Sequence, residues 1–192
     1  MKKYRFFGSF LDAQEKWLNK MSAKGYRLIR VGKLLYEFES CTPDEVQYHV
    51  EFIGEKSHDK AEDYKRFLEE LGYRVIYKNI NLGYSIGKLR YRPWAEKGGR
   101  IATKSTTYDR EVLIVEKSND GDPFDMHTSK NDIIWYYSKL RNPWLWFFVI
   151  FGVMGFIFKS IICGAFALAA LIPIILYQSK IGKIKKEKRL EE

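Results

Sequence analysis

The sequence of 192 residues has few of the side chains that build metal centres and disulfide frameworks. It contains two cysteines, Cys41 and Cys163, and three histidines, His49, His58 and His127. The cysteines lie far apart in the chain, and the histidines do not have the spacing of metal ligands. We therefore expect neither a disulfide framework nor a metal site.

The sequence also lacks the common catalytic and phosphate-binding motifs. The segment GYSIGK does not have the glycine spacing of either common nucleotide-binding fingerprint. The acidic turn DGDPFD lacks the alternating ligands and the terminal glutamate of a calcium loop. No serine nucleophile elbow and no Cys–His pair is recognisable. We therefore predict no catalytic residues and no cofactor, and we interpret the chain as a non-enzyme.

A long run with almost no charge is the strongest feature that is present. Residues 143–177 carry one formal charge, that of Lys159. A single helix over this run would be about 52 Å long, against a hydrocarbon core of about 30 Å, and would place the lysine near the bilayer centre. We therefore predict a transmembrane helical hairpin over residues 143–178, with spans at about 143–158 and 161–177.

Aromatic and basic residues mark the ends of this predicted hairpin. Trp144, Trp146 and Tyr177 suit an interfacial aromatic belt, and Lys159 suits the opposite interface. Basic residues lie before the run and in the tail at 179–192. Basic ends are typical of the cytoplasmic side, and the N-terminal region has no secretion signal. The pattern predicts a multi-pass membrane protein with both termini in the cytoplasm.

The net charge of +9 could also indicate nucleic-acid binding. No recognition motif accompanies the charge, and much of it flanks the uncharged run. We therefore expect the lipid bilayer, and not nucleic acid, to be the partner of this region. A buried hairpin in a soluble protein and a single re-entrant or tilted span remain as alternatives.

The polar part of the chain contains two similar seven-residue segments, AKGYRLI and later ELGYRVI. Each copy ends a segment with apolar residues at helical spacing and begins segments that alternate like strands. Asp12 and Asp59 are the predicted N-caps of the two helices. Gly25 and Gly72 are predicted to end them with positive φ angles. Duplication explains the repeat, with chance similarity as the alternative.

The repeat predicts an α+β fold over residues 1–122. Each unit reads strand, helix, strand, strand, and the two units are expected to form one antiparallel sheet with both helices on one face. The segment LGYSIGKLRY is predicted to supply the last strand of the second unit, and REVLIVEK a further strand. Residues 123–142 are predicted to be an amphipathic connecting segment that leads into the hairpin.

Several of these segments resemble the bacterial domain of unknown function 2812 (DUF2812). That family carries a helix with the pattern E-x-W-L-N-x-M-x-x-x-G, followed by strands with the patterns Y-x-F-E and Y-R-I-D-F. The matching positions here are Glu15, Trp17, Leu18, Asn19, Met21 and Gly25, then Tyr36, Phe38 and Glu39, then Tyr48, Val50, Glu51 and Phe52. A later passage, IVEKSNDGDPFDMHTSKNDIIWYYSKL, is also similar to the family.

The resemblance covers roughly residues 1–140 and implies no known activity. Genes of the family often lie beside a winged-helix repressor, which implies a regulatory setting. The chain departs from the family by an apparent insertion before REVLIVEK. It also has His49 and Glu51 where the family usually has arginine and aspartate.

Aromatic residues on or near the repeated units suggest a ligand site. We predict an aromatic cleft between the units, suited to an amphipathic or cationic ligand. Ordinary sheet packing is the alternative reading of these residues. The predicted set is Trp17, Tyr26, Tyr36, Tyr48, Tyr73 and Tyr84, with Glu51 as the polar anchor.

These features together predict a membrane-anchored protein whose cytoplasmic domain binds a small-molecule ligand or a membrane protein partner. Its role would be sensory or regulatory. The alternative is an accessory or immunity-type membrane protein in which the hairpin is the working part.

Overall fold

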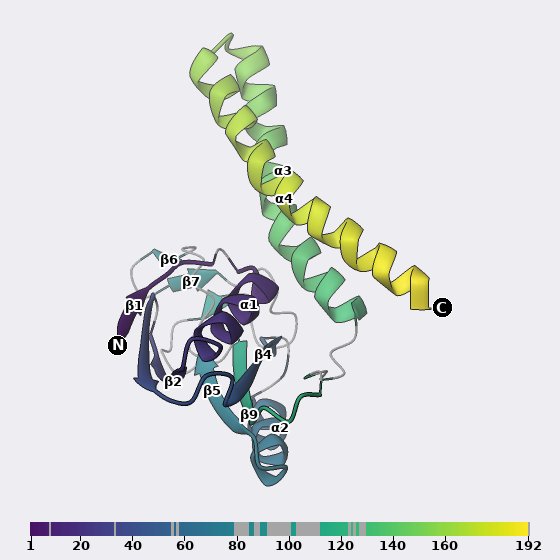
Figure 1. Ribbon diagram of the computed structural model, residues 1–192. Helices are drawn as coiled ribbons and strands as arrows, with labels where there is room; N and C mark the ends of the chain where they lie inside the picture. Colours follow the sequence, from purple (N-terminus) through teal and green to yellow (C-terminus); the bar gives the residue numbers. More distant parts are fainter. Residues whose placement is uncertain are drawn as a thin grey trace. The chain divides into compact units, whose positions relative to one another are not determined.

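The computed structural model describes most of the chain, and its two compact units are Met1–His127 and Thr128–Glu192 (Figure 1). The first unit is an α+β fold, and the second is a pair of long helices. The described residues are 1–7, 9–32, 34–54, 56, 58–78, 85–86, 89–91, 101–102, 112–122, 124, 126 and 130–191.

The first sheet is built from the first strand–helix–strand–strand unit. Its elements are β1 (Lys2–Tyr4), α1 (Leu11–Ser22), β2 (Tyr26–Val31) and β3 (Leu35–Ser40). The strands pair antiparallel in the order β1-β3-β2, so that the last strand lies in the middle. The face that carries Leu28, Tyr36 and Phe38 is buried, and Trp17 of α1 packs against the two rings.

The end of α1 agrees with its predicted glycine stop, but its start does not agree with the predicted cap. Gly25 has a φ of 78°, as predicted, and a Cβ atom there would lie 2.8 Å from the carbonyl oxygen of Cys41. Only glycine fits both restrictions. The helix begins at Leu11 with Phe10 at the N-cap, so the prediction of Asp12 as the N-cap is wrong.

The second sheet takes its central strand from a distant segment. Its elements are β4 (Val46–Phe52), α2 (His58–Glu70), β5 (Arg74–Lys78) and β9 (Val112–Ser118), and the strand order is β4-β9-β5. The predicted segment at residues 82–91 forms strand in its described parts, but it is not the third strand of this sheet. Its described parts, β6 (Ser85–Ile86) and β7 (Leu89–Tyr91), belong to a separate small sheet with β8 (Ile101–Ala102).

The apolar run in β9 explains why this strand is central. Residues 112–115 are all buried, although successive side chains of a strand point to opposite faces. A strand that is covered on both faces suits the middle of a sheet rather than its edge. The two sheets thus share one order, in which the third strand separates the first from the second.

The prediction of one continuous sheet with both helices on one face is also wrong. The strands of the two units form separate sheets. Helix α2 covers the face of the second sheet that carries Leu113 and Val115, through Ala61 and Leu68. Helix α1 packs on the first sheet and also lies along β4 (Figure 1). Each helix therefore packs on the sheet of its own unit.

The second unit is an antiparallel hairpin of α3 (Lys130–Ile157) and α4 (Ile161–Glu191). Residues 130–142 of the predicted connecting segment join the first span in one helix, and the second span continues into the basic tail. The helices approach closely near the turn, where a Cβ atom on Gly155 would lie 3.1 Å from the backbone nitrogen of Gly164. Both helices are long and apolar enough to cross a membrane.

Candidate functional site

Helix α1 satisfies the backbone groups along the outer edge of β4. The side-chain amide of Asn19 accepts the N–H of Tyr48 at 2.8 Å and donates to the carbonyl of Tyr48 at 2.9 Å. The hydroxyl of Ser22 donates to the carbonyl of Val46 at 2.5 Å. An unpaired strand edge is a site for unwanted pairing, and here side chains of α1 occupy it.

Glu15 continues this polar row by one further turn of α1. Its Oε2 accepts the backbone N–H of Val50 at 3.0 Å and lies 3.0 Å from Nδ1 of His49. Glu15 binds the neighbouring sheet, because the row of polar positions on α1 faces β4.

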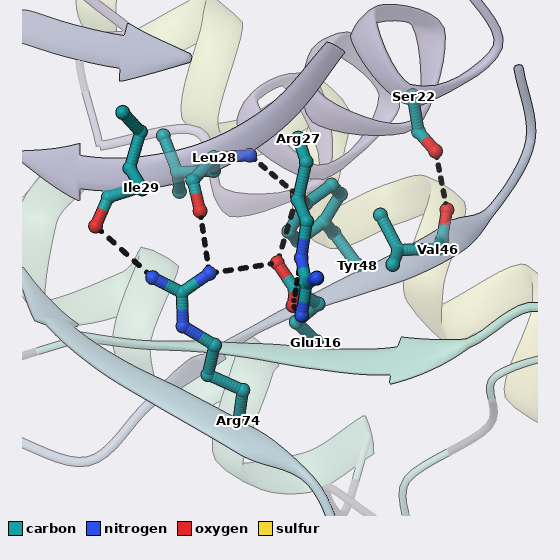
Figure 2. Close-up of polar contacts among 8 residues, drawn as sticks. All are labelled: Ser22, Arg27, Leu28, Ile29, Val46, Tyr48, Arg74 and Glu116. Atoms are coloured by element: carbon teal, nitrogen blue, oxygen red, sulfur yellow. Dashed lines mark hydrogen bonds and ion pairs between the residues drawn. The ribbon is translucent and has the colours of Figure 1, made fainter. Parts of the chain in front are cut away.

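An ionic network centred on the buried Glu116 links the two sheets (Figure 2). The strand register places Tyr48, Glu116 and Arg74 side by side across β4, β9 and β5. Arg27 reaches the same carboxylate from β2, with its Nε and Nη2 atoms donating to Oε1 at 2.9 and 2.7 Å. The Tyr48 hydroxyl donates to the other carboxylate oxygen, Oε2, at 2.9 Å. The Nη1 atom of Arg74 lies 3.5 Å from the same Oε2 atom.

The network also satisfies backbone groups of β2 beside an irregularity in its register. The N–H of Leu28 donates to the Tyr48 hydroxyl at 2.7 Å, and Arg74 donates to the carbonyls of Leu28 and Ile29 at 2.8 and 3.1 Å. The pairing of β2 with β3 shifts register between Leu28 and Arg30. Strand β2 is therefore held to the second sheet by side chains instead of a strand ladder.

The titration behaviour of this network follows from its burial. Loss of solvent raises the pKa of the Tyr48 hydroxyl, and the charge of Glu116 raises it further. The hydrogen bonds to Glu116 raise the pKa of Arg27. Both oxygens of Glu116 already accept hydrogen bonds, and the residue is 2% exposed. We therefore read this network as a structural link and not as a ligand site.

Two hollows of the first unit are lined by described residues. The smaller one, of about 210 Å³, is polar and carries two carboxylates. It lies where α1 and β4 meet the turn after β9. Its lining residues are Glu15, Asn19, Asp44, Val46, Gln47, Tyr48, Asn119 and Phe124.

The larger hollow, of about 490 Å³, combines basic and aromatic residues, and we call it the basic-aromatic hollow. The N-terminal segment, α1 and the start of β2 form its walls. The Arg5 guanidinium lies 5.3 Å from the centre of the Trp17 ring and 5.2 Å from that of Phe7. The lining residues are Met1, Lys3, Tyr4, Arg5, Trp17, Met21, Lys24 and Tyr26.

Two of the predicted ligand residues line this basic-aromatic hollow, and a third lies beneath it. Trp17 and Tyr26 are half-buried members of its wall. Tyr36 is fully buried and packs edge-on against Trp17, with ring centres 4.9 Å apart. Burial raises the pKa of the Tyr36 hydroxyl. Tyr36 therefore supports the wall of the hollow but has no exposed surface for a ligand.

The other predicted ligand residues lie elsewhere. Tyr48 belongs to the ionic network, whereas Glu51 points to the opposite face of β4 and accepts a hydrogen bond from Tyr64 at 2.7 Å. Tyr73 packs against Phe124, with ring centres 5.4 Å apart. Tyr84 is outside the described residues. The structure thus does not bring the predicted set together in one cleft with Glu51 as its anchor.

The four predicted membrane-interface residues occupy different positions on the hairpin. Trp146 is 70% exposed, and Trp144 is half-buried. Lys159 lies in the turn between the helices, with a φ of 47°. Tyr177 is 5% exposed and faces Tyr137 of the other helix, with ring centres 6.2 Å apart. Their role at a membrane interface stays a prediction.

The polar row on α1 and the buried carboxylate of β9 are features that the sequence reasoning missed. Glu15, Asn19 and Ser22 are spaced by four and three residues, which places them on one side of a helix. Glu116 directly follows four apolar residues in β9. Both signals were available, since a polar residue in a buried position requires a partner. Among the described residues, no group of three or more His, Cys, Asp or Glu side chains could hold a metal ion.

The fold and its hollows define the class of this chain, an α+β protein that continues into an apolar helical hairpin. The chain belongs to the family described as Protein of unknown function (DUF2812), which matches residues 10–149. The predicted family is therefore confirmed, and the match extends from the start of α1 into α3. Comparisons with curated proteins and with solved structures gave no match.

Proposed function

We propose that this protein is a membrane-anchored binding module. The hairpin of α3 and α4 is held in the lipid bilayer of a bacterial cell. The α+β unit remains in the cytoplasm and binds a ligand or a protein partner in a sensory or regulatory role.

The outward surface of the hairpin is the observation that carries this proposal. Phe156, Ile157, Phe158, Ile161 and Ile162 are between 64% and 90% exposed. Burial of one large apolar side chain is worth about 1.5–3 kcal/mol, so an apolar surface of this size in water is unfavourable. Lipid removes that cost, because its chains solvate such side chains.

The distribution of charge supports the proposed orientation. The turn that contains Lys159 is at one end of the hairpin, and the basic ends of α3 and α4 are at the other end. Basic flanks favour the cytoplasmic side of a membrane. The α+β unit precedes α3 directly, so the same rule places it in the cytoplasm and Lys159 at the outer face.

Membrane extraction tests the anchor. Full-length protein in lysed cells should sediment with membranes, resist an alkaline carbonate wash and dissolve only in detergent. A variant with Leu168→Glu and Ile172→Glu, both on the exposed side of α4, should be released by the wash. Recovery of the unaltered protein in the supernatant without detergent would contradict the anchor.

Cysteine labelling tests the orientation. In a background where Cys41 and Cys163 are serine, Lys159→Cys and Lys188→Cys would each supply a single thiol. A membrane-impermeant maleimide added to intact cells should label position 159 and spare position 188. The opposite result would place the α+β unit outside the cytoplasm.

An exchange of hairpins tests whether α3 and α4 serve only as an anchor. Gly155 lies close to Gly164, and Ala167 and Ala170 are buried, so small residues let the two helices pack closely. Such packing favours the second candidate role, in which the hairpin is the working part. If an unrelated hairpin restores a deletion phenotype, the binding role of the α+β unit is supported. If it does not, the hairpin itself carries the function.

A further inference from the structure

The basic-aromatic hollow has a charge of one sign. Lys3, Arg5 and Lys24 contribute three cationic groups, and none of the described residues that line it is acidic. All three are exposed, and within the described part of the chain no ion pair joins them to a carboxylate. Three like charges around one hollow repel one another, and an anion between them would relieve that repulsion.

The sheet register explains how cations come to lie beside aromatic rings. Lys3 is opposite Tyr36 in the pairing of β1 with β3, so the two side chains share a face of the sheet. The ring of Trp17 packs on that same face. Arg5, two residues further on, lies over Trp17. Two cations, Lys3 and Arg5, therefore lie beside the aromatic rings of Tyr36 and Trp17.

We propose that the basic-aromatic hollow binds a small anion with a flat apolar body, such as an aromatic carboxylate or an aryl phosphate. The body lies against Trp17 and Tyr26, and the anionic group lies among Lys3, Arg5 and Lys24. The volume of about 490 Å³ is in the range of small-molecule sites. This inference rests on the proposed binding role and names its ligand class.

The charge on the wall of this hollow is opposite in sign to the charge expected from the sequence, which placed Glu51 in the ligand site. An amphipathic or cationic ligand was expected, with Glu51 as its polar anchor. Glu51 is 6% exposed on another face, where Tyr64 binds it. The two predicted residues that do line the hollow, Trp17 and Tyr26, are accompanied by cations instead.

Binding of matched naphthalene probes tests the inference. Full-length protein in phosphatidylcholine nanodiscs is titrated calorimetrically with 2-naphthoate, 2-naphthalenemethanol and 2-naphthylmethylammonium, with empty discs as the blank. We expect the anion to bind at least about tenfold more tightly than the neutral and cationic probes. Its binding should also weaken several-fold when ionic strength rises from about 0.05 to 0.5 M.

Single substitutions locate the binding to the hollow. Lys24→Gln and Arg5→Gln should each weaken naphthoate binding about three- to tenfold. Lys20→Gln is the matched control, because Lys20 is an exposed lysine of α1 that does not line the hollow, and its effect should be under about twofold. Both altered cations are exposed, so these variants should fold normally.

A second lipid composition separates the two sources of such an anion. If discs rich in phosphatidylglycerol displace naphthoate, the hollow takes a lipid headgroup. If they do not, its ligand is a soluble anion.

Equal affinity for the three probes, the same affinity in the Lys24 and Lys20 variants, or no binding at about 10 mM naphthoate would overturn the inference. If the proposed membrane anchor is wrong, the membrane extraction experiment will show this independently of the binding measurements.

Discussion

Replacement of Arg27 by methionine should lower the folding stability of the α+β unit by about 3 kcal/mol. Methionine keeps the apolar stem of the side chain but removes the two hydrogen bonds to Glu116. The carboxylate is 2% exposed, and Tyr48 and Arg74 are its remaining partners. The substitution thus leaves the buried Glu116 carboxylate without its hydrogen bonds from Arg27.

The magnitude follows from the exposure of the two partners. Removal of one partner of a buried ion pair typically costs about 3–5 kcal/mol. The Arg27 side chain is 34% exposed, so solvent already screens part of the interaction, and the lower end of the range applies. Glu116→Leu should cost about 2 kcal/mol, because the arginines it releases can reach water.

A double-mutant cycle in the full-length protein measures the coupling. Denaturant unfolding in mild detergent, followed by near-ultraviolet circular dichroism, should give about 3 kcal/mol of coupling between the two substitutions. The double variant should be about as stable as Glu116→Leu alone. Arg66→Met is the control, because Arg66 and its partner Asp63 are both 67% exposed, and its effect should be under about 0.5 kcal/mol.

Additive effects of Arg27→Met and Glu116→Leu, with coupling below about 0.5 kcal/mol, would refute the reasoning. The same would follow if Arg27→Met and Arg66→Met had equal effects. In either case the ionic network would not be what holds β2 to the second sheet.

Three further predictions concern single positions. Gly25→Ala should lower the melting temperature more than Gly72→Ala, because both have positive φ angles but a Cβ atom meets a neighbouring atom only at Gly25, and calorimetry of both variants checks this. Burial lowers the pKa of Lys78 to about 8, so the folded protein loses this proton before the unfolded chain does as pH rises. Folding stability should therefore increase by about 2 kcal/mol from pH 8 to 10, and denaturant titrations should show that Lys78→Met removes this increase. Gly155→Val should loosen the helical hairpin and speed its amide hydrogen exchange, whereas Gly152→Val, which meets no neighbouring atom, should not.

The sequence predicts local features of this protein well, because few neighbouring residues decide them. Gly25 and Gly72 have φ angles of 78° and 85°, as their places after helical segments predicted. Trp17 and Tyr64, which precede these glycines by the same interval, both pack against sheets. Each of these outcomes depends on helix periodicity and on the freedom of glycine alone.

Strand pairing was predicted less well, since it depends on segments far apart in the chain. Residues 79–111 separate β9 from β5, and the nearer segments of β6 and β7 also alternate like strands. Local pattern does not tell which candidate becomes the central strand. The uninterrupted apolar run at 112–115 was the better guide, because a central strand is covered on both faces.

The composition of the ligand site could have been predicted better from strand parity. Tyr48 and Glu51 differ by three positions on one strand, so their side chains point to opposite faces. They could not line one cleft. The cations of the basic-aromatic hollow could not be predicted in this way, because the placement of Lys3 and Arg5 depends on the pairing of β1 with β3.

The strand order of the second sheet has a consequence for biosynthesis. β4 and β5 leave the ribosome early, but they are not neighbours and cannot pair until β9 emerges to lie between them. The strand segments β4 and β5 therefore remain unpaired in the nascent chain until β9 has been synthesised, shortly before the helices of the hairpin. Completion of the second sheet therefore overlaps in time with synthesis of the hairpin helices.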